Sequence, residues 1–192
     1  MNQRTLGTWI VMAVMLLCGV LVVSALQRAS NNVTLPLSDT SIIREQAAAK
    51  HLDPALIAAV IYAESKFEPR PSSAGAEGLM QILPATAYYL AHLSGGVSFT
   101  ASDLATPSVN LAYGSYYLRY LLNHYEGNEM LAVAAYNAGL TNVDEWVAHA
   151  RAQGTELSAA AIPFPETREY VRRVLSAQQA YRAKYPRALG IA

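Results

Sequence analysis

The longest apolar stretch of the chain lies at its N-terminus. No charged residue interrupts the segment between Arg4 and Arg28, and residues 9–23 are almost wholly apolar. A run of this length suits a helix that spans a bilayer, and it exceeds the apolar core of an ordinary secretory signal. A secretory signal cleaved after Ala25 is the alternative. We expect residues 1–28 to be retained as a membrane anchor. An intact mass of the membrane-fraction protein that corresponds to a chain starting at residue 26 would refute this.

Helical patterning dominates the rest of the chain. Residues 29–39 are mostly polar and contain a proline, which is typical of a linker. Asp53 followed by Pro54 then supplies a capping side chain and a helix-compatible proline before an apolar run. No run alternates like a strand, so we predict an all-α domain over residues 40–192. Its helices are predicted over residues 41–51 with Ser41 as the cap, then over 55–64, 80–93, 108–125, 129–136, a stretch after Thr141, and 166–185.

One predicted helix has no polar face. Every side chain from Leu56 to Ala63 is apolar or aromatic, so this helix should cross the core and present Glu64 at its end. A carboxyl near the negative end of a helix dipole and beside apolar groups should have a raised pKa, which a general acid at neutral pH requires. Taken alone, this segment also allows Glu64 to be simply the first solvated residue after a buried helix.

Two further segments bring polar side chains to the ends of apolar elements. Residues 72–82 form a loop of small residues in which glycines permit close backbone approach, and Gln81 falls in the first turn of the predicted helix that follows. The apolar run 131–136 ends at Asn137, which could also be only a C-terminal cap. Carboxyl, amide, hydroxyl and aromatic groups at element ends are typical of a carbohydrate cleft.

Charge and cysteine content exclude several classes of function. The chain has 14 acidic and 14 basic residues, a balance that gives no sign of a nucleic-acid partner. Cys18 is the only cysteine, so neither an intramolecular disulfide nor a cysteine metal cluster can form. A lipoprotein signal at Cys18 is weak, because Leu16 and Leu17 stand where small residues are expected. The four histidines are isolated, and we expect no metal site.

Four short motifs follow one another along the chain. They are Glu64-Ser65, the Gly-Leu-Met-Gln run at 78–81, the Ala-Tyr-Asn run at 135–137 and the run that begins at Glu166 and includes Tyr170. In this order they resemble the motifs of soluble-type lytic transglycosylases, which are relatives of goose-type lysozyme. The resemblance covers about residues 42–182. It implies a lysozyme-like helical domain, preceded by the anchor or signal helix, that binds the glycan strands of peptidoglycan.

The resemblance also implies a role for each matching residue. Glu64 would donate and accept the proton, and Ser65 would support its placement. Because the loop between Glu64 and Gln81 is one residue shorter than the family pattern, the active-site serine could be Ser72 or Ser73, and counting from Glu64 favours Ser73. The residues that would bind or line the substrate are therefore Ser65, Ser73, Met80, Gln81, Tyr136, Asn137, Glu166 and Tyr170.

The expected reaction uses one carboxyl, whereas most glycosidases use two. Glu68 and Glu77 look exposed, and Asp53 is better explained as a helix cap. The resemblance implies that Glu64 protonates the oxygen of the β-1,4 bond after N-acetylmuramic acid. The ionised carboxyl then accepts the proton of the sugar's own six-hydroxyl, which leaves a 1,6-anhydro end and needs no cofactor.

Two alternatives stay open. One is a lysozyme-like hydrolase on the same fold, which would need a base on the face opposite Glu64. The other is a non-catalytic peptidoglycan-binding scaffold of an envelope complex. In each case we expect a bacterial envelope protein that is anchored in the inner membrane and faces the periplasm, or is free in the periplasm if the N-terminal segment is cleaved. Its expected partners are glycan strands, the membrane through residues 1–28, and an unidentified envelope-complex protein.

Overall fold

The computed structural model describes residues 35–95 and 100–191. The predicted anchor over residues 1–28 lies outside the described residues, as does most of the predicted linker. Residues 36–192 form one compact unit. Within the described part, no helix is both long enough and apolar enough to cross a bilayer.

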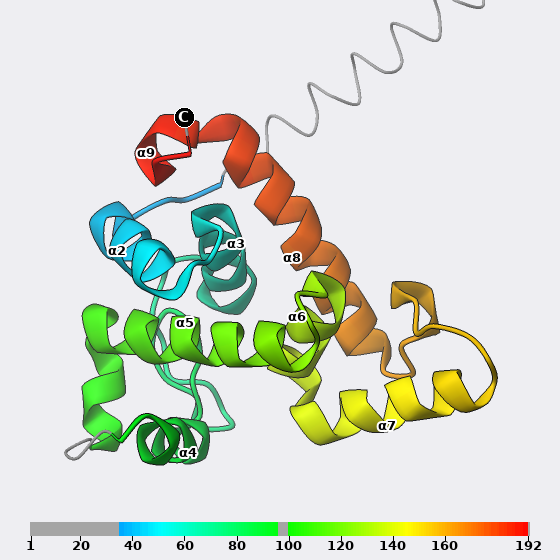
Figure 1. The fold of residues 1–192 in the computed structure, drawn as a ribbon. Coiled ribbons are helices and arrows are strands. Elements are labelled where there is room, and N and C mark those ends of the chain that lie inside the picture. The colour runs from blue at the N-terminus through cyan, green and yellow to red at the C-terminus, as the bar shows by residue number, and fades with distance from the viewer. Residues whose placement is uncertain (1–34, 96–99, 192) are drawn as a thin grey trace, which may run out of the picture. The chain divides into compact units, whose positions relative to one another are not determined.

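The described residues are helical, which confirms the predicted all-α class. The one extended pairing among them is an isolated bridge between Glu77 and Ile82. Figure 1 shows how the helices are arranged. In chain order the elements are α2 (Thr40–Lys50), α3 (Pro54–Ser65), α4 (Pro84–Ser94), the 3-10 turn η1 (Ala101–Ala105), α5 (Pro107–His124), α6 (Glu129–Ala138), α7 (Leu140–Ala152), the 3-10 turn η2 (Ala159–Ala161), α8 (Pro165–Lys184) and α9 (Pro186–Leu189).

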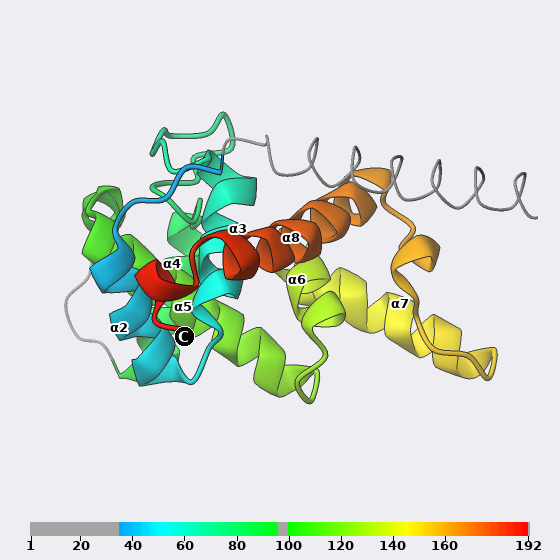
Figure 2. The ribbon, with the colours of Figure 1, turned by 90° about the horizontal axis from the view of Figure 1, so that it is seen from above.

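The helix α3 runs through the core, as its apolar sequence predicts. The Asp53 carboxylate accepts the backbone N–H of Ala55 at 3.0 Å, and Pro54 occupies the first turn, where its missing N–H costs nothing. All seven side chains from Ala55 to Ile61 are buried. In Figures 1 and 2, α3 lies between α2 and α8. Its last turn carries Glu64 to the edge of this core.

The helix α8 packs along both α3 and α6. Its buried residues recur every three or four positions, which gives the helix one core-facing stripe. They are Thr167, Tyr170, Val171, Val174, Ala177, Gln178 and Tyr181. The first half of α8 meets the C-terminal turns of both helices, because Tyr170 is bonded to Glu64 and Thr167 to Asn137. This meeting point contains most of the predicted site residues.

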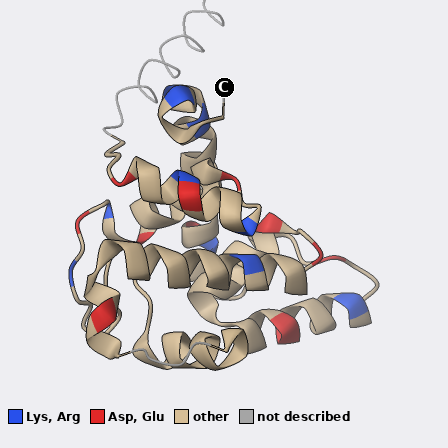
Figure 3. Ribbon diagram, turned by 60° about the vertical axis from the view of Figure 1, so that its left-hand side comes forward, with Lys and Arg blue, Asp and Glu red and all other residues tan. Residues whose placement is uncertain are grey.

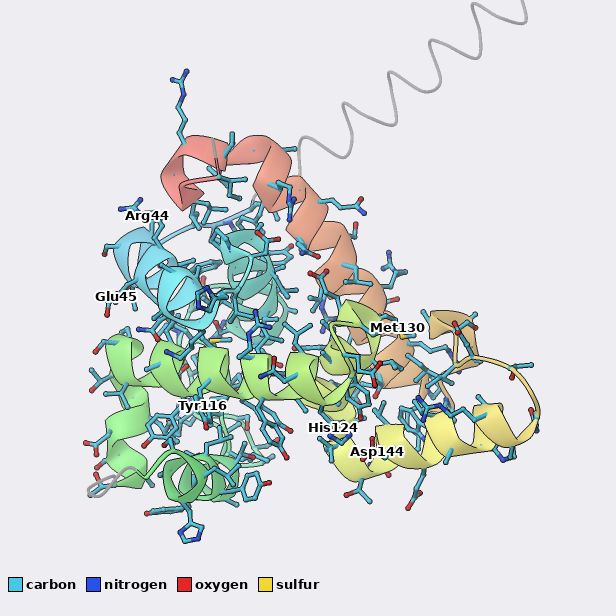
Figure 4. All side chains as sticks on the ribbon, in the orientation of Figure 1. Arg44, Glu45, Tyr116, His124, Met130 and Asp144 are labelled. Atoms are coloured by element: carbon cyan, nitrogen blue, oxygen red, sulfur yellow. The ribbon has the colours of Figure 1, made fainter. Side chains whose placement is uncertain are left out.

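The helices α5 and α7 complete the unit. α5 packs against α2 and α6, and His124 at its end lies 2.9 Å from the Asp144 carboxylate of α7 (Figure 4). Figure 3 shows that acidic and basic residues are interspersed over the helices, in keeping with the balanced charge of the sequence.

Two predicted helix starts are wrong. The helix predicted over 80–93 begins at Pro84, because Gln81 has a left-handed backbone (φ 48°) that an α-helix cannot contain. The backbone groups of Glu77 and Ile82 instead exchange two hydrogen bonds of 3.0 Å, so residues 77–82 form a tight turn. Ser41 is not a cap either, since the first helix begins at Thr40 and Asp39 holds the N-cap position.

The end of α6 also lies later than predicted. The helix continues to Ala138 and Gly139 is its C-terminal cap, so Asn137 belongs to the last turn. The alternative that Asn137 serves only as the cap is therefore excluded. The short elements η1, η2 and α9 were not predicted from the sequence.

Candidate active site

Glu64 and Tyr170 form the centre of the candidate site. The Tyr170 phenol donates a hydrogen bond of 2.6 Å to Glu64 Oε1, and this bond joins the end of α3 to the first half of α8. Tyr170 is only 2% exposed. A short bond between a neutral donor and a carboxylate is one of the stronger hydrogen bonds in proteins, so the orientation of the Glu64 carboxyl is well fixed.

The surroundings of Glu64 tune its acidity. Burial raises the pKa of Glu64 from 4.5 to about 7, because the ionised form loses its hydration. The Tyr170 hydrogen bond and the positive charge of Arg173 both pull the pKa back down. The guanidinium of Arg173 lies 5.5 Å above the centre of the Tyr170 ring. Near neutral pH, Glu64 is therefore poised to give up a proton and to take one back.

The turn over residues 77–82 is held in place by Asn110 of α5. The Asn110 side chain accepts the N–H of Met80 at 2.7 Å and donates to the carbonyls of Glu77 and Leu104 at 2.8 and 3.0 Å. Asn110 is fully buried. A buried amide with three well-made bonds of this kind fixes the backbone around it, because losing any of them leaves an unpaired polar group.

The Met80 side chain, which the resemblance places along the substrate, is buried in this structure. Met80 is 0% exposed and packs against α5, where a Cβ on Gly114 would come within 2.8 Å of the Met80 Cβ. The side chain therefore lies between the turn and α5 and supports the turn from behind. The Met80 carbonyl accepts the Tyr136 phenol at 3.0 Å, so Tyr136 is tied to the same turn.

Ser65 and Gln81 connect this turn to α3 and to the loop before it. The Ser65 hydroxyl lies 2.8 Å from the carbonyl of Leu79 and 3.2 Å from that of Ile61, in its own helix. The Gln81 amide nitrogen donates to the carbonyls of Arg70 and Gly78 at 2.7 and 2.8 Å. Both Gln81 bonds use the nitrogen of the amide as the donor.

A hollow of about 310 Å³ opens beside Glu64. Gln81 and Ser72 line it together with Ser65, and the Ser72 hydroxyl accepts the N–H of Ala76 at 2.9 Å. Ser73 is exposed and is not among the lining residues. Of the two serines left open by the sequence, Ser72 is therefore the one at the hollow, although counting favours Ser73.

Asn137 and Glu166 lie at the other side of Tyr170. Asn137 Oδ1 accepts the hydroxyl of Thr167 at 2.8 Å, and Thr167 is 2% exposed. Asn137 itself is exposed, so its amide nitrogen can reach a ligand. Glu166 is exposed in the first turn of α8 and does not line the hollow beside Glu64.

Three residues of the site were missed by the sequence reading. Asn110, Thr167 and Arg173 act on Met80, Asn137 and Glu64 from other helices. Arg173 is exposed, yet its guanidinium lies over the Tyr170 ring. Its neighbour Arg172 forms an exposed ion pair with Glu169. For Asn110, the usable signal was a polar amide inside the otherwise apolar stripe of its helix.

Over residues 35–95 and 100–191, no group of three or more His, Cys, Asp or Glu side chains is placed to hold a metal ion.

The sequence also matches a known family. The profile described as "Transglycosylase SLT domain" matches residues 41–158. The "Soluble lytic murein transglycosylase" of Escherichia coli K12 is 31% identical over 150 residues, which are 77% of this chain and 23% of that protein. The "Putative soluble lytic murein transglycosylase" of Haemophilus influenzae is 38% identical over 120 residues, which are 62% of this chain and 20% of that protein.

Solved structures of lytic transglycosylases also resemble this chain. An inactive glutamate-to-glutamine mutant of the lytic transglycosylase Slt of Pseudomonas aeruginosa has a TM-score of 0.72 and 32% identity, and the match covers 80% of this chain and 25% of that one. The 70-kDa soluble lytic transglycosylase in complex with bulgecin A has a TM-score of 0.72 and 31% identity, over 78% of this chain and 25% of that one. The chain thus spans about a quarter of these relatives. The names of the Escherichia coli and Haemophilus influenzae relatives call them soluble, so they give no support to a membrane anchor.

Proposed function

The chain belongs to the transglycosylase SLT domain family, and we propose that it is a lytic transglycosylase that cleaves peptidoglycan glycan strands with Glu64 as its single catalytic carboxyl. One observation carries the proposal: a buried carboxyl at the end of an apolar helix, with a pKa of about 7, is held by the neutral phenol of Tyr170. A group with this pKa can act as acid and then as base at the same pH.

The proposed reaction begins with proton donation. Tyr170 occupies Glu64 Oε1, so Oε2 is the oxygen that carries the proton and delivers it to the bridging oxygen after N-acetylmuramic acid. The bond from that oxygen to the anomeric carbon breaks, and the acetamide of the same sugar stabilises the positive centre. The six-hydroxyl oxygen then bonds to the anomeric carbon, and its proton returns to Glu64. The product is a 1,6-anhydro end, and no water is consumed.

The ionised state of Glu64 in this reaction gives Tyr170 and Arg173 a role beside the carboxyl. While Glu64 is charged, the Tyr170 hydrogen bond and the positive charge of Arg173 stabilise it against the desolvation caused by its burial. Burial alone would raise the pKa further and make the protonated carboxyl a weaker acid. The two opposing effects keep it near neutrality, where both steps of the reaction can proceed.

One carboxyl is sufficient in this proposal because the hollow offers no second one suited to catalysis. Apart from Glu64, the acid among its lining residues is Glu68. Glu68 is exposed and forms a 2.8 Å ion pair with Arg70, so it has the properties of a solvated surface carboxylate. A hydrolase with two carboxylates would need a buried base opposite Glu64.

The remaining site residues are proposed to hold the sugar. Gln81 would accept a hydroxyl through its amide oxygen, while Asn137 would donate from its amide nitrogen, because Thr167 already occupies Asn137 Oδ1. Ser72, with Ser73 as the alternative, would contact the substrate from the loop side. Glu166 would contact it at the exposed rim of α8.

Activity on peptidoglycan requires the domain to reach the cell envelope. We retain the proposal that residues 1–28 direct the chain there and hold it in the inner membrane, with 29–39 as a linker and 40–192 as the catalytic domain. Partners other than the glycan strand, such as a protein of an envelope complex, belong to the same proposal.

The test is mass spectrometry of the fragments that the chain releases from purified cell-wall sacculi, beside its Glu64→Gln variant. We expect anhydro-ended fragments from the parent chain, and a loss of at least about a thousandfold in the variant, because its amide cannot donate a proton to the leaving group. Fragments with reducing ends would contradict the lyase and favour the hydrolase. Release by neither protein would favour the non-catalytic scaffold.

A further inference from the structure

Two side chains from the first turns of α8 contact two different parts of the candidate site. Thr167 and Tyr170 are three residues apart, so they lie on the same face of the helix, and each is 2% exposed. The Tyr170 phenol donates to Glu64 at the end of α3 at 2.6 Å. The Thr167 hydroxyl donates to Asn137 Oδ1 in the last turn of α6 at 2.8 Å. The same face of α8 therefore holds both the Glu64 carboxyl and the Asn137 amide.

The single proton of the Thr167 hydroxyl fixes which way the Asn137 amide points. A hydroxyl donates one hydrogen bond, and a buried donor without an acceptor destabilises the fold. Within the described residues, Asn137 is the one hydrogen-bond partner of this hydroxyl. If the amide turned over, its NH₂ group would face the hydroxyl, and the hydroxyl proton would have no acceptor. The bond therefore keeps Asn137 Oδ1 toward Thr167.

The other end of the Asn137 amide is left as a donor. Asn137 is exposed, and its amide nitrogen has no acceptor in the described part of the chain. Its two N–H groups can therefore bind an acceptor oxygen of a ligand. A ligand group that can only donate, such as an ammonium, would meet N–H groups there, because Oδ1 faces the buried hydroxyl of Thr167.

We propose that Thr167 is a positioning residue of the site, which orients the Asn137 amide so that its nitrogen donates to an acceptor oxygen of the glycan strand. Thr167 acts on the substrate through Asn137, and its hydroxyl determines that Asn137 recognises acceptors and not donors. The inference rests on the proposed function, because it takes the ligand to be a glycan.

The test is a double-mutant cycle of Thr167→Val and Asn137→Ala on the full-length chain. The measured quantity is the rate at which limiting protein releases anhydro-ended fragments from purified sacculi. Thr167→Val is expected to lower this rate about three- to tenfold, because the Asn137 amide can then turn over. In the Asn137→Ala background the same change should leave the rate within about twofold, since no amide remains to be oriented. Thr167→Ser keeps the hydroxyl and should restore most of the rate.

Asn137→Asp tests the orientation of the amide directly. The aspartate side chain has nearly the same shape, but an ionised carboxylate has no donor, so we expect a loss at least as large as in Asn137→Ala. A parent-like rate in Asn137→Asp would mean that Asn137 presents an oxygen to the substrate, and the proposal would be wrong.

Thr155→Val is the matched control for the loss of a hydroxyl. The Thr155 hydroxyl bonds to the backbone carbonyl of Ala150 at 3.1 Å, at the end of α7, and contacts none of the proposed site residues. We expect Thr155→Val to leave the rate of release within about twofold of the parent. If Thr167→Val does not fold, Thr167→Ala takes its place in the cycle.

An equal loss from Thr167→Val with and without Asn137 would overturn the positioning role, because the effect would then reach the site by another route, such as a shift of Tyr170. An unchanged rate in Thr167→Val, or an equal loss in Thr155→Val, would overturn it as well.

A binding measurement separates this proposal from the one it rests on. The same cycle is repeated in the Glu64→Gln background, which prevents cleavage, with calorimetry of the hexamer of β-1,4-linked N-acetylglucosamine. The affinities should show the same dependence of Thr167 on Asn137. If the parent chain releases no fragments but the binding cycle shows this dependence, the proposed reaction is wrong and the role of Thr167 stands. If fragments are released but neither cycle shows it, the role of Thr167 alone is wrong.

Discussion

The segment between α3 and α4 consists of two halves with opposite environments. In residues 66–75, eight of ten side chains are exposed, and the other two, Phe67 and Ser72, are partly exposed. In residues 76–82, five of seven are buried, and the remaining two are Glu77 and Gln81. The buried half is bonded to α3, α5 and α6 through Ser65, Asn110 and Tyr136.

Because the two halves differ in burial, we expect them to have different roles. The buried half is a fixed wall, because side chains from three core helices hydrogen-bond to its backbone. The exposed half forms the rim of the hollow beside Glu64 and contributes Arg70 and Ser72 to its lining. Changes in the buried half should therefore cost stability and activity together, whereas changes in the exposed half should affect mainly substrate contacts and cost less stability.

The largest contrast is expected between two glycines, one from each half. Both have a left-handed backbone, with φ of 73° at Gly78 and 78° at Gly75. An added Cβ on Gly78 would strike the Asn110 amide and come within 2.6 Å of the Leu104 carbonyl, while around Gly75 nothing lies within 4 Å. Gly78→Ala should therefore cost about 3–4 kcal/mol of unfolding free energy, and Gly75→Ala about 1 kcal/mol.

Chemical denaturation of both variants checks this prediction. Gly75→Ala controls for backbone strain, because it imposes the same left-handed penalty on the new side chain. Equal losses of stability in Gly78→Ala and Gly75→Ala would mean that the turn over 77–82 can shift to accommodate a Cβ. The division into a fixed wall and a free rim would then be wrong. If Gly78→Ala does not fold, the loss is larger than predicted and the division stands.

The sequence predicted the fixed parts of the site where the determinants are local. Asp53 and Pro54 define the start of α3, and the apolar run that follows places Glu64 at its end. The left-handed backbone of Gln81 was not predicted, because the apolar residues on both sides of it fit a helical period. Pro84, at the true start of α4, was the available signal for the later boundary.

The long-range contacts could not be predicted from local patterns. Asn110 is 30 residues from Met80, and Tyr170 is 106 residues from Glu64. Only the packing of α5 and α8 brings these pairs together. The motif resemblance implied that Tyr170 lines the cleft near the carboxyl, but it could not supply the bond to Oε1. Nor could it reveal that the Met80 side chain is buried behind the wall.

The titration of Glu64 gives a second test of the boundary between the wall and the rim, without a change in packing. It stands just before the exposed half, yet burial raises its pKa from 4.5 to about 7. Between these two pH values the folded chain keeps a proton that the unfolded chain releases, so the unfolding free energy falls as the pH rises. It stays lower above pH 7. The full effect is about 3.5 kcal/mol, at about 1.4 kcal/mol for each unit of pKa.

Glu64→Gln removes this titration, so its stability relative to the parent should depend on pH. From pH 4 to pH 8, the variant should gain about 3 kcal/mol on the parent chain, measured by denaturation at each pH. Any constant difference, such as a weaker bond from Tyr170, cancels between the two pH values. A difference that does not change with pH would mean that the carboxyl titrates near its ordinary pKa. Glu64 would then belong to the solvated rim, and its suitability as a neutral-pH acid would be lost.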